Sequence, residues 1–251
     1  MKRLLFVAVI VVIAVVLGCG GGGGGGGGGN GNTGTTGTIT NISMQAVWAG
    51  TQATLNMADL ATGNKLTLEM VGFNSAGNYV VLSGATFSTI APSNVATLSG
   101  ATLRITGSSN GTSYTITGVY QGTTYNLSFD SVGQMAQVYG TVRDINNVNI
   151  AGAEVEFFDS AGTNVGEVTS GFSGQFVANV PTSAVGFTVD LSSLSATYFN
   201  DYLYNGLGYT ISVGNCHTSL QKLTLNKVTS LPFPIVAVPI SSGAPPPPDG
   251  C

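Results

Sequence analysis

Positively charged side chains are scarce in this sequence, which contains seven Lys and Arg against eleven Asp and Glu. Two of the seven, Lys2 and Arg3, lie in an N-terminal segment that we expect to be removed. The remaining chain then has five basic and eleven acidic side chains, and a net charge near −6. Phosphate contacts need clustered Lys and Arg. The composition therefore predicts no nucleic-acid partner and disfavours an anionic membrane surface.

Histidine and cysteine are also rare, which limits the chemistry that the chain can perform. His217 is the only histidine, so a metal cage built on several His ligands is excluded, and we expect no metal and no cofactor. Cys216 precedes His217, but neighbouring residues in a strand point to opposite faces, which disfavours a Cys–His dyad. The sequence also lacks a phosphate-binding loop and a serine-nucleophile motif. We therefore expect no enzyme.

Only one long hydrophobic run is present, at residues 4–17, between a basic start and the pair Gly18 and Cys19. This order is typical of a secretory signal peptide. A membrane-spanning helix needs about 20 apolar residues, so the run is too short to be one. The segment Val16–Cys19 resembles the bacterial lipoprotein signal box, which implies lipidation of Cys19 with acyl chains such as palmitate. The alternative is an ordinary secretory signal whose Cys19 forms a disulfide.

Ten consecutive glycines follow, at Gly20–Gly29. Glycine buries no side chain and loses the most backbone entropy on folding, so we expect a disordered, flexible linker. The predicted divisions of the chain are a signal peptide (1–18), the lipidated Cys with a Gly-rich linker (19–35), a first β-sandwich domain (36–134), a second β-sandwich domain (135–243) and a Pro-rich tail (244–251).

Apolar and polar residues alternate through residues 36–134, with turn residues every ten or so positions. This pattern predicts an antiparallel sandwich or barrel. Hairpin turns are expected at 75–78, 108–111 and 121–122, and a helical turn at 55–60. The faces expected to be buried are Ile42, Met44, Ala46 and Trp48; Leu66, Leu68 and Met70; and Leu103 and Ile105.

A motif opens the second domain: Gly140–Asp144, then Asn147, then Ile150–Val155. It resembles carboxypeptidase regulatory-like domains, which are transthyretin-like β-sandwiches with the pattern G-x-V-x-D-x-x-G-x-P-[LIV]-x-G-A-x-V. Asn147 stands where that family has Gly, in an expected left-handed turn, and Asn149 replaces Pro. Ser170–Phe176 matches the later T-D-x-x-G-x-[FY] pattern, with Ser for Thr and Gly for Asp. The resemblance implies structural or binding work without catalysis.

The periodicity of residues 135–243 agrees with a second sandwich. The fold class is therefore predicted as mainly β, with two tandem antiparallel β-sandwich domains. The inner faces expected here are Ala153, Val155 and Phe157; Phe176, Ala178 and Val180; Phe187, Val189 and Leu191; and Val236, Val238 and Ile240.

If Cys19 carries lipid, Cys216 and Cys251 remain as a pair in an oxidising compartment. A disulfide between them would close a loop of about 35 residues and stabilise by about 3–4 kcal/mol in the chain-entropy model. The polyproline tail then serves as a stiff spacer that brings Cys251 to Cys216. Free thiols and an intermolecular bridge remain as alternatives.

Several aromatic residues are candidates for a ligand-facing surface. Trp48 is expected to fill the first core, with sugar stacking as the alternative. Tyr198, Tyr202, Tyr204 and Tyr209 crowd one segment, and this is the cluster we most expect near a surface. It would form a face for glycan or peptide, or else a loop packed over the sandwich edge.

Two carboxylates invite a catalytic interpretation. Glu154 and Glu156 share a strand face at roughly 7 Å, which is within the range of glycosidase pairs. A solvated face is the simpler interpretation, and a hydrolase remains the alternative. The segment 144–147 offers oxygen ligands for Ca²⁺ but has no second carboxylate close by in the sequence, so we expect a plain turn.

Together these features predict an exported lipoprotein of a bacterial cell envelope. Gly20 offers no retention charge after Cys19, which favours the outer membrane or cell surface over the inner membrane. The predicted role is non-catalytic structural or adhesive binding; a carbohydrate-binding accessory protein and a hydrolase are the alternatives. The expected partners are the membrane, through lipidated Cys19, and an envelope protein or polysaccharide.

Overall fold

The computed structural model describes residues 38–76, 78–210, 217–245, 247 and 249–250. The predictions for the signal peptide, the Gly-rich linker, Cys19, Cys216 and Cys251 lie outside these residues. Among the described residues, no helix has the length and apolar character needed to cross a membrane.

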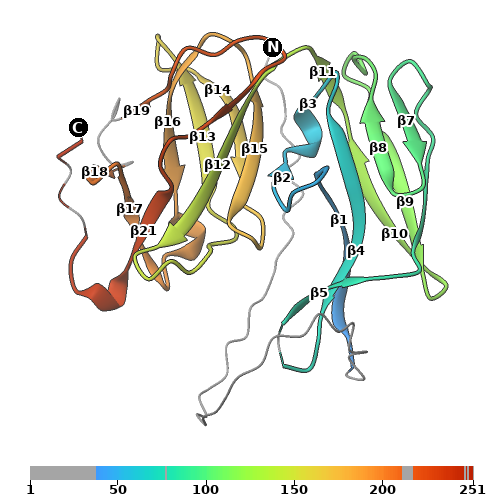
Figure 1. Ribbon diagram of the computed structural model, residues 1–251, viewed down its shortest axis with the longest axis horizontal. Helices are drawn as coiled ribbons and strands as arrows, with labels where there is room; N and C mark the ends of the chain where they lie inside the picture. Colours follow the sequence, from blue (N-terminus) through green and yellow to red (C-terminus); the bar gives the residue numbers. More distant parts are fainter. Residues whose placement is uncertain (1–37, 77, 211–216, 246, 248, 251) are drawn as a thin grey trace. The chain divides into compact units, whose positions relative to one another are not determined.

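Strands dominate the regular structure, which confirms the mainly β fold class (Figure 1). The elements up to residue 134 are β1 (Thr40–Trp48), β2 (Thr54–Leu55), the 3-10 helix η1 (Met57–Asp59), β3 (Leu60–Ala61), β4 (Lys65–Phe73), β5 (Tyr79–Leu82), β6 (Thr86–Thr89), β7 (Ala96–Ser99), β8 (Thr102–Ile105), β9 (Tyr114–Tyr120), β10 (Thr123–Phe129) and β11 (Ser131–Gly133). The later elements are β12 (Ala136–Asp144), β13 (Glu154–Asp159), β14 (Asn164–Thr169), β15 (Gln175–Val180), β16 (Ala184–Asp190), η2 (Ser192–Leu194), β17 (Tyr198–Tyr204), β18 (Leu207–Thr210), β19 (Thr218–Ser219), β20 (Val228–Ser230), β21 (Ile235–Pro239) and η3 (Ile240–Ser242).

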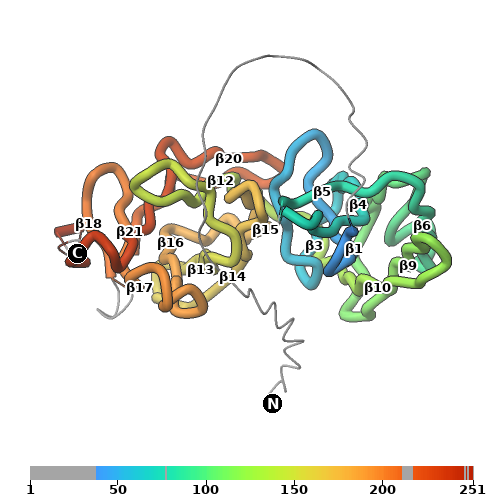
Figure 2. Tube along the Cα trace, turned by 90° about the horizontal axis from the view of Figure 1, so that it is seen from below, coloured from blue at the N-terminus to red at the C-terminus, as the bar shows by residue number. Residues whose placement is uncertain are grey.

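The strands form four sheets in the described residues. The largest has the order β18-β17-β21-β12-β15-β2-β1-β4-β8-β7, with β20 beside β12 and β5 beside β4. The others are β10-β9-β6, β14-β13-β16-β19 and the pair β11-β3. Not every pair is antiparallel: β12 is parallel to β21 and to β20, which lies beside it in Figure 2, and β15 is parallel to β2. Parallel pairs need long crossovers, which local alternation does not reveal.

Two clusters of buried apolar side chains form the cores. The first takes residues from β4 and β8 on one side and from β9 and β10 on the other, and the predicted inner faces at 66–70 and 103–105 are confirmed. The second lies among β12, β13, β15, β16, β17 and β21, and confirms the predicted faces at 153–157, 176–180 and 187–191. Val177 of β15 belongs to the first cluster although its strand neighbours belong to the second. The contacts group the described residues into one compact unit, so the boundary at 134/135 stays a prediction.

The predicted turns are partly confirmed. Gln121 and Gly122 have positive φ and join β9 to β10 in a two-residue hairpin. Asn74 organises the β4–β5 hairpin, because its side-chain oxygen accepts from the backbone of Ala76 and Asn78. The helical turn at 55–60 is confirmed as η1. The hairpin at 108–111 is wrong: the turn exists, but β8 pairs with β4 and β7 whereas β9 pairs with β10 and β6.

The turn after β12 is the one predicted from the motif. Asn147 has a φ of 64°, as expected for a left-handed turn. The Asp144 carboxylate accepts from the backbone N–H groups of Asn146 (2.7 Å) and Val148 (2.9 Å). Asp144 thus caps the turn with its own side chain. Ser170 also bonds locally, since its hydroxyl accepts from Ala153 N (3.0 Å) and donates to Ile150 O (2.8 Å).

One predicted inner face is wrong at two of its three positions, Val236 and Ile240, whereas Val238 is buried as predicted. In β21 the fully buried residues are Ile235 and Ala237, while Val236 is half-buried and Ile240 is exposed in η3. The sequence there is apolar at every position from 235 to 238, so its periodicity does not distinguish the two faces.

The described part of the Pro-rich tail lies against β18. Gly208 N donates to the Asp249 carboxylate (2.6 Å), and Gly250 N donates to Gly208 O (2.8 Å). A Cβ on Gly250 would lie 2.5 Å from Cζ of the Tyr209 ring, so only glycine fits against this ring without a shift. Hydrogen bonds therefore hold the tail at this strand.

Candidate functional site

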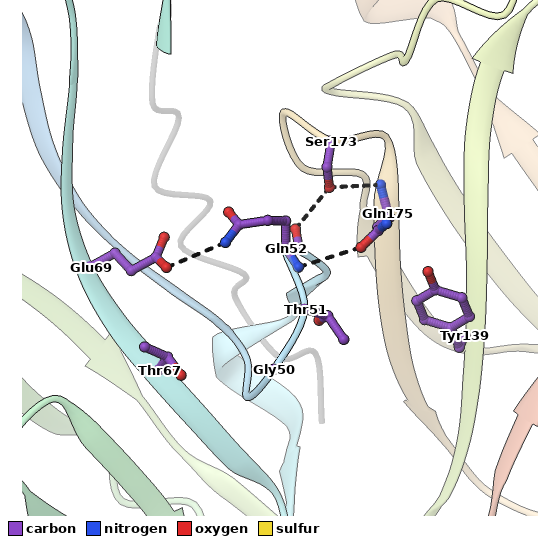
Figure 3. A pocket seen from close by; sticks show the side chains of 8 residues that line it. All are labelled: Gly50, Thr51, Gln52, Thr67, Glu69, Tyr139, Ser173 and Gln175. Atoms are coloured by element: carbon purple, nitrogen blue, oxygen red, sulfur yellow. Dashed lines mark hydrogen bonds between the residues drawn. The ribbon is translucent and has the colours of Figure 1, made fainter. Parts of the chain in front are cut away.

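A cavity of about 520 Å³ opens beside the loop that follows β1 (Figure 3). The loop and β4 line it through Gly50, Thr51, Gln52, Thr67 and Glu69. Across from them lie Tyr139 of β12, Ser173 of the turn before β15, and Gln175, the first residue of β15. Segments more than a hundred residues apart in the sequence thus meet at one surface.

Local hydrogen bonds fix the loop that carries Gln52. Trp48 N donates to Ala53 O (2.8 Å), which closes the loop. The Thr51 hydroxyl donates to Trp48 O (2.8 Å) and accepts from Ala53 N (3.0 Å). Gly50, at the tip, has a φ of 84°, which favours glycine. The loop therefore presents Gln52 in a defined position.

The opposing turn docks onto the backbone of Gln52. The Ser173 hydroxyl donates to Gln52 O (3.0 Å), and Gln52 N donates to the Gln175 side-chain oxygen (3.4 Å). Gly174 N closes the turn by donating to Gly171 O (2.8 Å). Both sides of the cavity are thus joined by hydrogen bonds around Gln52, as the dashed lines in Figure 3 mark.

Glu69 is the charged residue in this lining, and amides hold both of its oxygens. It pairs with Gln45 across β1 and β4. Gln45 Nε2 donates to Glu69 Oε2 (2.9 Å), and Gln52 Nε2 donates to Glu69 Oε1 (3.4 Å). Hydrogen bonds to an ionised carboxylate are stronger than those between neutral groups, and the three side chains form a hydrogen-bonded polar row.

A second cavity of about 380 Å³ adjoins the first and shares Gln52 and Ser173 with it. Its other lining residues are Gln45, Tyr79, Val80, Val81 and Phe172. We call the two cavities together the Gln52 groove. Among the described residues that line the groove there is no Lys, Arg, His or Cys.

Aromatic rings form one end of the Gln52 groove. Phe172 is 45% exposed, yet its ring lies 4.7 Å from that of Tyr79 and 5.5 Å from that of Phe73, centroid to centroid. The Tyr79 hydroxyl accepts from Gln45 Nε2. Burial first, and then the charge of Glu69, raise the pKa of Tyr79 to about 12, so its phenol is neutral at physiological pH.

The sequence-based site residues do not lie in this groove. Trp48 is half-buried and packs against the first core, as expected, with its ring 6.2 Å from that of the groove residue Tyr139. Tyr198 is half-buried on β17. The surface placement is wrong for Tyr202, Tyr204 and Tyr209, which are at most 9% exposed. The segment is a hairpin whose turn, Asn205-Gly206, has positive φ at both positions, and this dipeptide was the signal for it.

The groove residues were missed because most of them look ordinary in the sequence. Gln45 and Glu69 sit at outward polar positions of alternating strands, where Gln and Glu are common. Phe172 was the one available signal: it is a large apolar residue inside a Ser/Gly turn.

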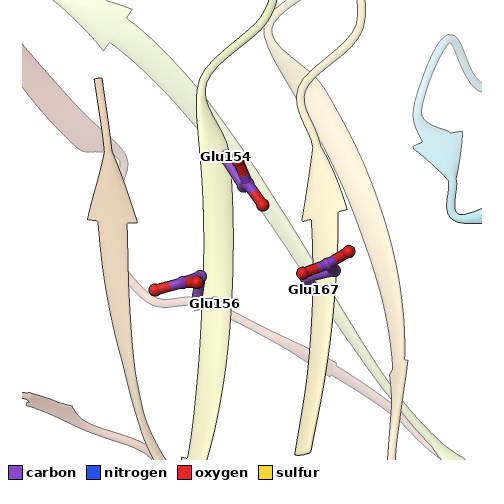
Figure 4. A group of neighbouring side chains, drawn as sticks. All are labelled: Glu154, Glu156 and Glu167. Atoms are coloured by element: carbon purple, nitrogen blue, oxygen red, sulfur yellow. The ribbon is translucent and has the colours of Figure 1, made fainter. Parts of the chain in front are cut away.

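The carboxylate pair lies elsewhere and has a third member (Figure 4). Glu154 and Glu156 of β13 lie beside Glu167 of β14, and carboxylate oxygens from all three lie within 4.8 Å of one another. Glu156 stands directly opposite Glu167 in the sheet. Neither cavity of the Gln52 groove is lined by these residues. The sequence predicted a solvated pair of glutamates, whereas the structure shows three glutamates crowded together.

The acidic cluster makes stability depend on pH. Burial first, and then the neighbouring carboxylates, raise the pKa of Glu154 and Glu156. A raised pKa means that the folded state binds the proton more tightly, so the free energy of unfolding is highest in mild acid and falls as pH rises through the raised values. Glu167→Gln removes the opposing charge, and we expect it to stabilise at pH 7 by about 0.5 kcal/mol. Thermal unfolding at pH 4.5 and pH 7 measures both effects.

Asp201→Asn is the matched control for Glu167→Gln, because Asp201 lies on β17 in a different sheet. Burial also raises the pKa of Asp59 and Asp130, so part of the pH dependence remains in the Glu167 variant. Equal melting temperatures of Glu167→Gln and the parent at pH 7 would contradict the charge-crowding argument.

No protein-family model and no curated protein matches this sequence. Among solved structures, the chain is similar to the T6 backbone pilin of serotype M6 Streptococcus pyogenes, with 10% identity, a TM-score of 0.25, and coverage of 79% of this chain and 70% of that chain. It is similar to the group B streptococcus pilus 2b backbone protein, with 11% identity, a TM-score of 0.25, and coverage of 81% and 87%. It is also similar to BcpA, the major pilin subunit of Bacillus cereus, with 11% identity, a TM-score of 0.21, and coverage of 79% of this chain and 69% of that chain. At these TM-scores the likenesses carry no argument about this chain.

Proposed function

We propose that this chain is a non-catalytic binding protein of a bacterial cell envelope, with a structural or adhesive role. Its anchor is the lipid expected at Cys19, and several acyl chains on one residue give a stable attachment. Its place is the outer membrane or the cell surface. The resemblance of residues 135–243 to carboxypeptidase regulatory-like domains supports a non-catalytic role.

The observation that carries this proposal is the lining of the Gln52 groove. The carboxylate of Glu69 is engaged on both oxygens by Gln45 and Gln52. General acid–base catalysis needs a positioned proton carrier with a matched pKa, and covalent catalysis needs an activated nucleophile. The described lining residues provide neither, since apart from Glu69 their side chains are amides, hydroxyls, aromatic rings and the aliphatic groups of two valines. A groove of this kind supports binding rather than chemistry.

The test uses the full chain, produced in a bacterial host and purified in detergent. The protein is immobilised and exposed to fractionated bacterial envelope. We expect it to retain an envelope polysaccharide or one envelope protein, and we expect Gln52→Ala to lower the retained amount at least several-fold.

Gln221→Ala is the matched control, because Gln221 is also an exposed glutamine and does not line the groove. Retention that is equal in the parent and the Gln52 variant would place binding outside the groove. Retention of nothing would overturn the adhesive role.

A further inference from the structure

Resting on the proposed function, we propose that the Gln52 groove binds an uncharged polysaccharide, with Phe172 as the stacking face and the row Gln45–Glu69–Gln52 as the hydrogen-bonding wall. The two cavities adjoin and share Gln52 and Ser173. Their volumes, about 520 and 380 Å³, each lie in the range of ligand pockets. A continuous groove of this kind suits a chain-like ligand that fills both cavities.

The hydrogen-bonding capacity of the groove suits hydroxyl groups. In the described part of the chain, the Gln52 side-chain oxygen and the Gln175 side-chain NH₂ have no hydrogen-bond partner, so an acceptor and a donor are both open to a ligand. The hydroxyl of Thr67, which also lines the groove, adds a group that both donates and accepts. A sugar hydroxyl likewise donates and accepts, and can satisfy both kinds of group.

The charge of the groove excludes an anionic ligand. Its described lining contains the carboxylate of Glu69 and no cation. A phosphate, sulfate or uronate placed there would lose water without gaining an opposite charge, and it would be repelled by Glu69. The ligand is therefore not an anion, which separates it from the acidic polymers of an envelope.

The aromatic end supplies what a sugar ring needs on its apolar face. Phe172 is 45% exposed at the groove, while the ring of Tyr79, tilted by 32° to it, and the ring of Phe73, edge-on to it, pack against its ring. Rings fixed in this way present a face without losing further rotamer freedom when a ligand binds. The C–H face of a pyranose packs on such a ring while its hydroxyls reach the amides. One groove thus offers both surfaces of a carbohydrate.

Affinity electrophoresis of the full chain in detergent tests the proposal. The probes are four uncharged polysaccharides, namely dextran, laminarin, galactomannan and hydroxyethylcellulose, with dextran sulfate and polygalacturonate as charged counterparts. We expect at least one uncharged polymer to slow migration, and neither charged one. Phe172→Ala should weaken that binding at least tenfold, and Gln52→Ala should weaken it as well.

Phe233→Ala and Gln221→Ala are the matched controls. Phe233 is 42% exposed and packs on Tyr204, away from the described groove lining, so its loss should leave binding unchanged. Phe172→Trp keeps an aromatic face and should retain binding, which separates loss of stacking from loss of folding. Melting temperatures are measured for every variant.

Three outcomes overturn the proposal: no uncharged polymer binds, only charged polymers bind, or Phe172→Ala binds as the parent does. Retention of an envelope protein that depends on Gln52, without polysaccharide binding, would overturn the neutral-glycan ligand and keep the proposed binding function. If the chain binds no uncharged polysaccharide and also retains no envelope component, both the neutral-glycan ligand and the proposed binding function are rejected.

Discussion

Replacing Phe176 with Ala is expected to lower the free energy of unfolding by about 3–5 kcal/mol, the range for a large aromatic side chain in a packed core. Phe176 is fully buried in the second core. Its ring lies over Gly140, the residue that it faces across β12 and β15. The change therefore opens a cavity in the second core, and urea unfolding followed by fluorescence or circular dichroism measures the loss of stability. Phe233→Ala, at an exposed position, should cost far less.

Gly140 gives the same contact a second test from the opposite strand. A Cβ at this position would lie 2.4 Å from Phe176 Cζ and 2.9 Å from Leu231 Cδ1. Gly140→Ala is therefore expected to cost about 1–3 kcal/mol through overpacking. Phe176→Leu removes the ring atoms that clash, so the alanine should cost less in that background, with a coupling of about 1 kcal/mol. Strictly additive costs would contradict the proposed contact.

This contact explains why two distant motif positions could be read from the sequence. Gly140 begins the first motif, Phe176 ends the second, and the sheet places them side by side. Gly174 follows the same logic: its φ is 71°, and a Cβ there would lie 2.3 Å from Val142 O. Where a side chain would clash with its neighbours, the position requires glycine, and such a requirement can be recognised in the sequence. The fold class, the turn at Asn147 and most inner faces were predictable for this reason.

Other features left no local signature. The partners of β8 and β9 depend on which sheet each strand joins, and an Asn-Gly turn between them does not decide this. The Gln52 groove depends on contacts such as that between Gln52 and Gln175, which are 123 positions apart. Neither alternation nor turn chemistry encodes such contacts, because both are properties of short windows. The surface placement predicted for the tyrosines of 198–209 was wrong for a related reason. The Asn and Gly residues there suggested a surface loop, whereas Asn205 and Gly206 form the turn of the β17–β18 hairpin, whose tyrosines are mostly buried.

Replacing Tyr202 with Ala is expected to destabilise the protein by about 3–5 kcal/mol rather than to remove a ligand contact. Tyr202 is fully buried, and its ring stacks on that of Tyr209 at 5.4 Å. Its hydroxyl lies 3.0 Å from the hydroxyl of Thr218, which is also buried. Tyr202→Phe keeps the ring and leaves the Thr218 hydroxyl without that partner, so we expect a cost of about 1–2 kcal/mol. Adding Thr218→Val removes the orphaned hydroxyl and should recover part of this cost.

The ionisation of Tyr202 provides a second readout of its burial. Burial raises its pKa well above the ordinary value for a phenol, although the hydrogen bond with Thr218 acts the other way. The folded state therefore holds the proton more tightly than the unfolded state, and the free energy of unfolding should fall as pH rises above about 10, where unfolded tyrosine ionises. The parent should lose more stability between pH 9 and pH 11 than Tyr202→Phe does. Equal losses of stability in the two proteins would mean that Tyr202 is exposed, and a Tyr202 variant would then be a suitable test of ligand binding. Because Tyr202 is buried, ligand binding is tested with Phe172 variants instead.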